Sequence, residues 1–289
     1  MFFDCSARVK LRVRGADSFR FLNGQLTNDL RKATAASTIQ GSILSAKGKL
    51  NAHVFISIES ESSFLLDADR ELTDQVSARL ERYIIADDVE IDNVTDLFSI
   101  YHFLGEPPPA AAAVSGRVVA SNRYGLSGWD LWCNSAPPEV IRKQFSDRYI
   151  YCDDTCAEVF RIERGIPRWG RELTNDIIPV EANLEATSVD YGKGCYIGQE
   201  VISRMKMSGQ TNKRLCGLIS ASELPLEPET RLTSETDRMR DAGWITSATR
   251  SARVGGEIAL GYVKRGFNET GTRLLAGGKP VKVVPLPFV

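Results

Sequence analysis

The chain has 289 residues, a length that predicts two or three domains rather than a single small one. Its 36 basic and 37 acidic residues give a formal net charge of -1, which argues against a general attraction to DNA, RNA or anionic lipid. Hydrophobic residues make up 43% and charged residues 25%, a composition that excludes a disordered or fibrous chain. We expect a cytoplasmic protein, because residues 1–15 lack the apolar core of a secretory signal and no segment approaches the length of a membrane span.

The cysteine and histidine content argues against a disulfide framework or a metal centre. Six cysteines at irregular spacing do not form a secreted disulfide pattern, so we expect reduced thiols. The only two histidines, His53 and His102, lie far apart and lack a second ligand at zinc-type spacing. We therefore expect no metal site, and we interpret both histidines as ordinary structural or surface residues.

The first elements predict a β-α-β arrangement. Residues 7–14 alternate apolar and basic side chains, which is typical of a half-buried strand. A helix follows, begun by Asp17 and carrying its apolar residues at helical spacing. Residues 38–46 then return as an apolar strand.

Residues 47–96 predict a second unit of β-β-α-β order. Segments 49–58 and 62–68 are apolar and are separated by a short polar turn, which indicates a hairpin. Apolar residues repeat at helical spacing over 72–83, and residues 89–94 form a further strand. We expect this unit to be an inserted lobe.

The remainder of the chain predicts a mixed segment followed by a small barrel. Residues 99–105 and 116–133 indicate strands, and residues 137–145 and 152–165 indicate helices. From Leu215 onward, short strands divided by glycine-rich turns have the spacing of a small β-barrel. The expected domains are residues 1–46 together with 97–209, residues 47–96, and residues 210–289.

Residues 192–200, GKGCYIGQE, carry the strongest chemical signal in the sequence. Gly194 and Gly198 allow a sharp turn that presents Cys195. A helix is predicted just after the cysteine, and both its amino-terminal end and Lys193 favour the thiolate form. Cys195 is then a reactive thiol. The alternative is that it is a small buried residue beside a turn, as many free cysteines are.

This segment resembles the K-G-C-[FY]-x-G-Q-E signature of the YgfZ-like folate-binding proteins, a branch of the aminomethyltransferase-like superfamily that includes mitochondrial iron-sulfur assembly factors. Residues 15–30, 45–55 and 160–173 resemble further conserved boxes of that family. The resemblance implies an α+β, three-lobed folate-binding fold with a carboxyl-terminal small β-barrel. It implies functional roles for the signature residues Lys193, Gly194, Cys195, Tyr196, Gly198, Gln199 and Glu200.

The resemblance also implies tetrahydrofolate or a derivative as cofactor. A folate pocket needs aromatic or apolar walls and a few placed polar groups. The candidates for folate contacts are Asn51, Tyr101, Trp129, Arg161 and Glu163. Arg161 and Glu163 could equally form surface ion pairs, and Trp129 could equally belong to a packed core.

Asn51 and Ala52 stand where the aminomethyltransferases are expected to carry a carboxylate that acts on a folate nitrogen. An asparagine amide does not exchange a proton near neutral pH, so aminomethyl transfer is disfavoured. Asn51 could also be a simple polar residue at a strand edge.

The resemblance therefore implies an accessory factor for iron-sulfur protein assembly or repair and for dependent tRNA modification, acting through Cys195. Its partners would be iron-sulfur client or assembly proteins, with an indirect link to tRNA and none to DNA or membrane. Two alternatives stay open: a folate-dependent one-carbon transferase, and a scaffold whose cysteine is structural.

Overall fold

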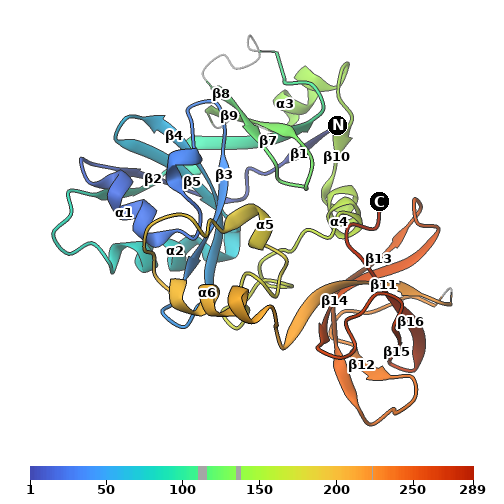
Figure 1. Cartoon of the computed structure of the whole chain (residues 1–289). Coiled ribbons are helices and arrows are strands. Elements are labelled where there is room, and N and C mark those ends of the chain that lie inside the picture. The colour runs from blue at the N-terminus through green and yellow to red at the C-terminus, as the bar shows by residue number, and fades with distance from the viewer. Residues whose placement is uncertain (110–115, 135–137, 223) are drawn as a thin grey trace. The chain divides into compact units, whose positions relative to one another are not determined.

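The computed structural model describes residues 1–109, 116–134, 138–222 and 224–289 (Figure 1). They form two compact units, one from residues 1–154 and 186–201 and the other from residues 155–185 and 202–289. Helices and sheets are mixed along the chain, which confirms the expected α+β class. No helix in the described ranges is both long enough and apolar enough to cross a membrane.

The first sheet of the first unit is built around the expected hairpin. Its strands, in spatial order, are β3 (Ile39–Leu44), β4 (Leu50–Ser60), β5 (Ser63–Ala68), β2 (Val9–Arg14) and β6 (Glu90–Asn93). The β4–β5 hairpin is confirmed. A two-stranded hairpin is only marginally stable by itself. Here β4 also pairs with β3 and β5 pairs with β2, so residues 47–96 share a sheet with earlier strands and do not form the separate lobe that we expected.

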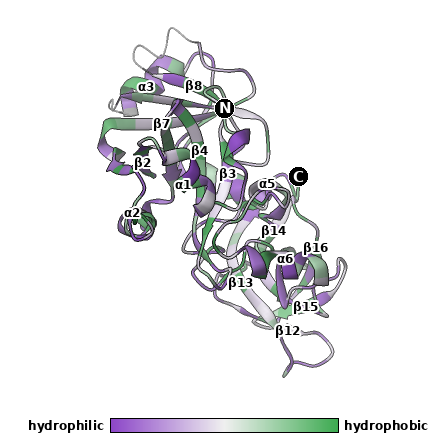
Figure 2. Ribbon diagram, turned by 60° about the vertical axis from the view of Figure 1, so that its left-hand side comes forward, coloured by the Kyte–Doolittle hydropathy of each residue, from purple (hydrophilic) through white to green (hydrophobic). Residues whose placement is uncertain are grey.

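Two helices accompany this sheet, α1 (Ser18–Gln25) and α2 (Thr73–Glu81) (Figure 1). Each buries apolar residues at helical spacing, such as Val76 and Leu80 in α2. Figure 2 shows both hydrophilic and hydrophobic segments along α2, as expected of a helix that buries one face. Short 3₁₀ helices are η1 (Leu30–Lys32), η2 (Arg70–Leu72) and η3 (Thr95–Leu97).

A second sheet of the first unit has its own aromatic core. Its strands, in spatial order, are β10 (Tyr151–Cys152), β1 (Phe2–Asp4), β7 (Phe98–Leu104), β9 (Gly128–Asn134) and β8 (Arg117–Ser121). Phe2, Phe103 and Phe145 pack together, the last of these from helix α3 (Pro138–Phe145). Strands β1 and β10 were not predicted, because two or three residues carry no readable periodicity.

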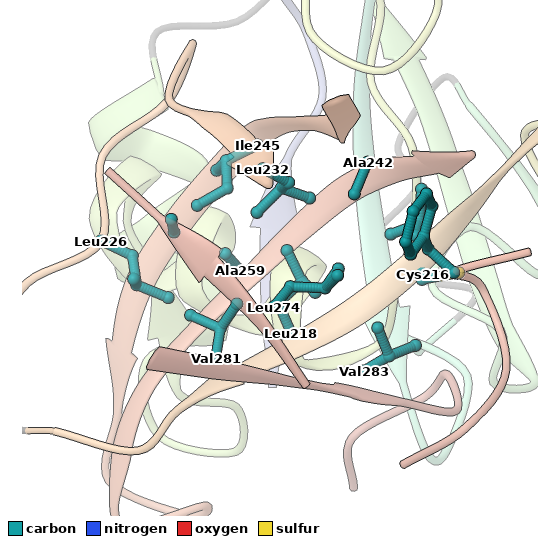
Figure 3. Close-up of a cluster of buried hydrophobic side chains, with 13 residues drawn as sticks. Cys216, Leu218, Leu226, Leu232, Ala242, Ile245, Ala259, Leu274, Val281 and Val283 are labelled. Atoms are coloured by element: carbon teal, nitrogen blue, oxygen red, sulfur yellow. The ribbon is translucent and has the colours of Figure 1, made fainter. Parts of the chain in front are cut away.

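The expected carboxyl-terminal barrel is confirmed. It closes through β11 (Lys213–Ser220), β14 (Gly256–Lys264), β13 (Asp241–Ser251), β12 (Arg231–Ser234), β15 (Arg273–Ala276) and β16 (Lys279–Val284). Buried apolar side chains, among them Leu218, Ile245 and Leu274, fill its interior (Figure 3). The remaining helices are α4 (Asp154–Glu163), α5 (Glu185–Ser188) and α6 (Gln199–Ser208).

A buried ionic network joins the two sheets of the first unit. Arg123, in the connection from β8 to β9, donates to Asp67 of β5 at 2.8 Å and to Asp130 of β9 at 2.9 Å. His102 of β7 contacts the same Asp130 through Nδ1 at 2.8 Å. Burial alone would raise the pKa of Asp130, but the Arg123 charge and the His102 contact hold it below its ordinary value. Arg8 also pairs with Asp67, whereas Asp130 has Arg123 as its arginine partner among the described ion pairs.

We predict that Arg123→Met lowers the free energy of unfolding by about 3 to 5 kcal/mol, because it leaves the buried Asp130 without its arginine and Asp67 with Arg8 alone. Urea denaturation followed by circular dichroism measures this loss. Arg14→Met is the matched control, since Arg14 pairs with Glu90 at the surface and should cost less than about 1 kcal/mol. Equal losses in the two variants would contradict the predicted role of the network.

Candidate functional site

Cys195 is an exposed free thiol in the first unit. The side chain of the neighbouring Tyr196 is buried. Helix α6 begins at Gln199, close to the expected position, and Glu200 lies exposed in its first turn. Cys133 and Cys216, in contrast, are buried free thiols. The expectation that the signature loop presents Cys195 is thus confirmed, and the alternative of a buried residue is excluded.

Lys193 is buried and anchors this loop to helix α1. Its ammonium donates to the carbonyl oxygen of Leu26 at 2.6 Å and to that of Asn23. These carbonyls lie at the carboxyl end of the helix, where backbone acceptors lack helical partners and the helix dipole favours a cation. Burial lowers the pKa of Lys193 to about 8, although the charges of Asp29 and Asp190 oppose the shift. Its described hydrogen bonds are to α1 and not to Cys195.

Gly198 fixes the other end of the loop against the turn between β3 and β4. Its φ of 85° lies in the left-handed region, and a Cβ there would lie 2.7 Å from the Ser45 carbonyl oxygen. At Gly194 an added Cβ would meet nothing within 4 Å, and its φ lies outside the left-handed region. The expected need for glycine therefore holds at Gly198 and not at Gly194.

Asn51 lies where the register between β3 and β4 shifts. Ile43 pairs with Ala52 and Leu44 pairs with Leu50, so Asn51 has no opposite residue on β3. Such β-bulges re-aim a side chain and occur often beside functional sites. The Asn51 Oδ1 atom accepts a hydrogen bond from Nε of Arg79 at 3.2 Å.

Arg79 of helix α2 is a half-buried cation with neutral partners. Its guanidinium donates to Gln25 Oε1 at 2.9 Å and to the Leu44 carbonyl oxygen at 2.7 Å, and it lies 4.1 Å from the Tyr83 ring centroid. No carboxylate contacts it among the described residues, and burial lowers its pKa. Arg79 therefore brings an unneutralised positive charge to the side chain of Asn51.

Tyr101 and Trp129 belong to the second sheet and not to the strand that carries Asn51. Tyr101 is fully buried in the aromatic core, and burial raises its pKa to about 12. Trp129 packs against the same core and donates to the Gly105 carbonyl oxygen at 3.2 Å. The packing alternative given for Trp129 therefore describes its environment, and Tyr101 lies in the same core.

Arg161 and Glu163 are held by internal contacts of the second unit. Arg161 donates to Glu172 at 3.0 Å and to Ser247 at 2.8 Å, while Glu163 accepts from Ser251 at 2.6 Å. All five of these side chains are buried, so Arg161 and Glu163 do not form the surface ion pairs that the sequence left open. The contacts attach helix α4 to strand β13 of the barrel.

The sequence analysis missed Arg79 and left open whether His53 is a structural or a surface residue. His53 is buried on β4, two residues from Asn51, and its Nε2 atom has no hydrogen-bond partner in the described structure. Burial lowers its pKa to about 4, so the ring is neutral at physiological pH. The apolar run around His53 was the available signal that it is an interior residue. Arg79 carried no signal, because its contacts come from distant parts of the chain.

The other cysteines and acidic residues offer no further centre. Cys152 and Cys156 are disulfide-bonded, so the expectation of reduced thiols is wrong for these two. Within the described ranges, no three His, Cys, Asp or Glu side chains gather in a way that could hold a metal ion.

We predict a specific pH signature for the Lys193 anchor. Because its pKa is about 8 in the folded chain and about 10.4 when unfolded, the unfolded chain binds more protons between these values. The free energy of unfolding of the wild type should therefore rise relative to Lys193→Met from pH 8 to pH 10, by at most about 1.4 kcal/mol per pH unit. Urea titrations at several pH values measure it. The exposed Lys47→Met is the control, and a flat or falling difference for Lys193→Met would contradict the prediction.

Residues 213–289, which contain the barrel, match the family model of the glycine cleavage T-protein C-terminal barrel domain. The whole chain is similar in fold to the aminomethyltransferase T of the glycine cleavage system from Bartonella henselae, with a TM-score of 0.85 and 18% identity. That match covers 100% of this chain and 86% of the other. The expected aminomethyltransferase-like fold with its carboxyl-terminal barrel is thereby confirmed.

Three curated relatives are similar to this chain in sequence. The iron-sulfur cluster assembly factor IBA57 homolog of Dictyostelium discoideum is 26% identical over 72% of this chain, which spans only 60% of that relative's length. The tRNA-modifying protein YgfZ of Vibrio vulnificus is 27% identical over 81% of this chain and 75% of its own length. The aminomethyltransferase of Bacillus subtilis is 25% identical over 93% of this chain and 81% of its own length. The chain therefore resembles YgfZ-like proteins and the aminomethyltransferases of the glycine cleavage T-protein superfamily.

Proposed function

We propose that this protein is a tetrahydrofolate-binding accessory factor for the assembly or repair of iron-sulfur proteins and, through them, for tRNA modification. The observation that carries the proposal is the exposed thiol of Cys195 on a loop fixed by Lys193 and Gly198. The names of the Dictyostelium and Vibrio relatives support the two processes. Partners would be iron-sulfur client or assembly proteins.

Cys195 would act as the contact residue. A thiolate is a soft ligand for iron-sulfur clusters and a nucleophile toward sulfur and carbon centres. Such chemistry needs access, which Cys195 has and which the buried Cys133 and Cys216 lack. It also needs a defined position, which the anchored loop supplies, because an exposed cysteine on a loose loop would lose entropy on each encounter.

The surroundings of Asn51 fit a folate better than the other predicted contacts do. Asn51 offers an amide edge at a β-bulge, Arg79 offers an unneutralised charge, and His53 has a buried nitrogen without a partner. Unsatisfied polar atoms of this kind are costly unless a ligand or water meets them. These residues would hold the folate, and the bound folate would supply a one-carbon carrier. Arg161 and Glu163 already have hydrogen-bond partners within the second unit.

Aminomethyl transfer is the second candidate, favoured by the 25% identity to the Bacillus transferase over 93% of this chain. Asn51 speaks against it, because its amide cannot gain or release a proton at neutral pH. Ala52 supplies no polar group at all. The surroundings of Arg79 do not compensate, since its partners are amide and carbonyl oxygens.

We predict that Cys195→Ser abolishes most of the protein's support for iron-sulfur enzymes while the fold survives. The free energy of unfolding should change by less than about 0.5 kcal/mol, as for other exposed substitutions. The measurement is iron-sulfur enzyme activity in a bacterial strain depleted of its own YgfZ-like protein and complemented with each variant.

The control is Cys216→Ser, which removes a buried barrel thiol. Brief iodoacetamide labelling of the wild type should modify Cys195 well before Cys133 or Cys216. Full complementation by Cys195→Ser would contradict the proposed role of the thiol, whatever the labelling order.

We further predict that reduced folates bind with a dissociation constant below 1 mM, about -4 kcal/mol or stronger, and that no methylenetetrahydrofolate forms from an aminomethyl donor. Calorimetry measures the binding and product analysis measures the transfer. An absence of heat at millimolar folate would contradict the cofactor proposal. Product formation at ordinary enzymatic rates would instead establish the transferase.

A further inference from the structure

The contact between Arg79 and Asn51 fixes which atom of the Asn51 amide remains available to a ligand. A guanidinium has donors only, so the atom that Nε meets at 3.2 Å must be the amide oxygen. The other atom of the Asn51 amide is then the nitrogen, with two N–H donors. No hydrogen bond from this nitrogen occurs among the residues that the structure describes. Asn51 therefore presents a donor and keeps its acceptor turned toward Arg79.

Arg79 is itself held in one orientation. Beyond its contact to Asn51, it binds Gln25 at the end of α1 and the carbonyl oxygen of Leu44 at the end of β3. The guanidinium also lies over the ring of Tyr83, which follows the end of α2. Leu44 lies directly at the register shift that isolates Asn51, so Arg79 binds both strands of the bulge. The amide cannot turn over without losing a hydrogen bond.

The polarity of this position is opposite to that of a carboxylate. A carboxylate only accepts hydrogen bonds and suits an N–H on the ligand, whereas the available amide nitrogen only donates and suits a ligand oxygen or unprotonated nitrogen. Two donors facing each other leave both unsatisfied, which costs affinity.

We propose that Arg79 is a positioning residue that makes Asn51 a hydrogen-bond donor, and that the site therefore selects a folate bearing an acceptor at this point, such as a formyl oxygen, over one bearing an N–H. The proposal rests on the proposed function, in which a folate binds beside Asn51. Its substrate class is the N-acylated reduced folates, for which 5-formyltetrahydrofolate is the probe.

The test is the ratio of two dissociation constants, for tetrahydrofolate and for 5-formyltetrahydrofolate, measured by calorimetry on the full chain. In the wild type the formyl compound should bind about tenfold or more tightly. Asn51→Asp should reverse the preference, because the new carboxylate pairs with Arg79 and turns an acceptor outward. Arg79→Met should bring the ratio close to one, since the amide is then free to turn over.

Arg82→Met is the matched control, because Arg82 is an exposed arginine just past the end of α2 and should leave the ratio at the wild-type value. A purely structural role of Arg79 would weaken both folates alike and leave the ratio unchanged, which would overturn the proposal. Equal affinities in the wild type would overturn it as well. If Arg79→Met fails to fold, the Asn51→Asp ratio decides alone. Binding of neither folate overturns the cofactor proposal and this one with it.

Discussion

The ammonium of Lys193 lies against the last carbonyls of helix α1, and the position of the signature loop depends on this contact. A helix end leaves acceptors that need donors, and a buried lysine is stable only where such acceptors converge. The two requirements satisfy each other here. Lys193 thereby fixes the buried side of the loop to helix α1, and Cys195 lies on the exposed side. Gly198 completes the arrangement where no side chain would fit.

The same helix end also supports the strand that carries Asn51. Gln25, the last residue of α1, accepts from Arg79, and Arg79 in turn orients the Asn51 amide. Lys193 and Arg79, which come from distant parts of the chain, therefore both bind the carboxyl end of helix α1. The loop that carries Cys195 and the β-bulge at Asn51 therefore both depend on the end of α1, within a single compact unit. A substitution at this helix end would affect the position of both.

Polar residues in a conserved-looking box do not by themselves reveal a ligand site. Arg161 and Glu163 looked like pocket residues, yet their charged atoms attach helix α4 to the barrel. Arg79 had no motif around it, yet its described hydrogen bonds go to amide and carbonyl oxygens and not to a carboxylate. Buried charges are usually paired with an opposite charge, so a cation without a carboxylate carries more information about ligands than a paired one does.

The sequence by itself determined the α+β class, the carboxyl-terminal barrel and the exposed Cys195, because periodicity, glycine spacing and a contiguous motif are local features. It did not determine the sheet shared by residues 47–96 with β2 and β3, since strand pairing depends on partners far along the chain. Nor did the sequence show which groups Lys193 and Arg79 bind. Those hydrogen bonds join residues 28 to 170 positions apart, and only the tertiary structure brings such groups within reach of each other.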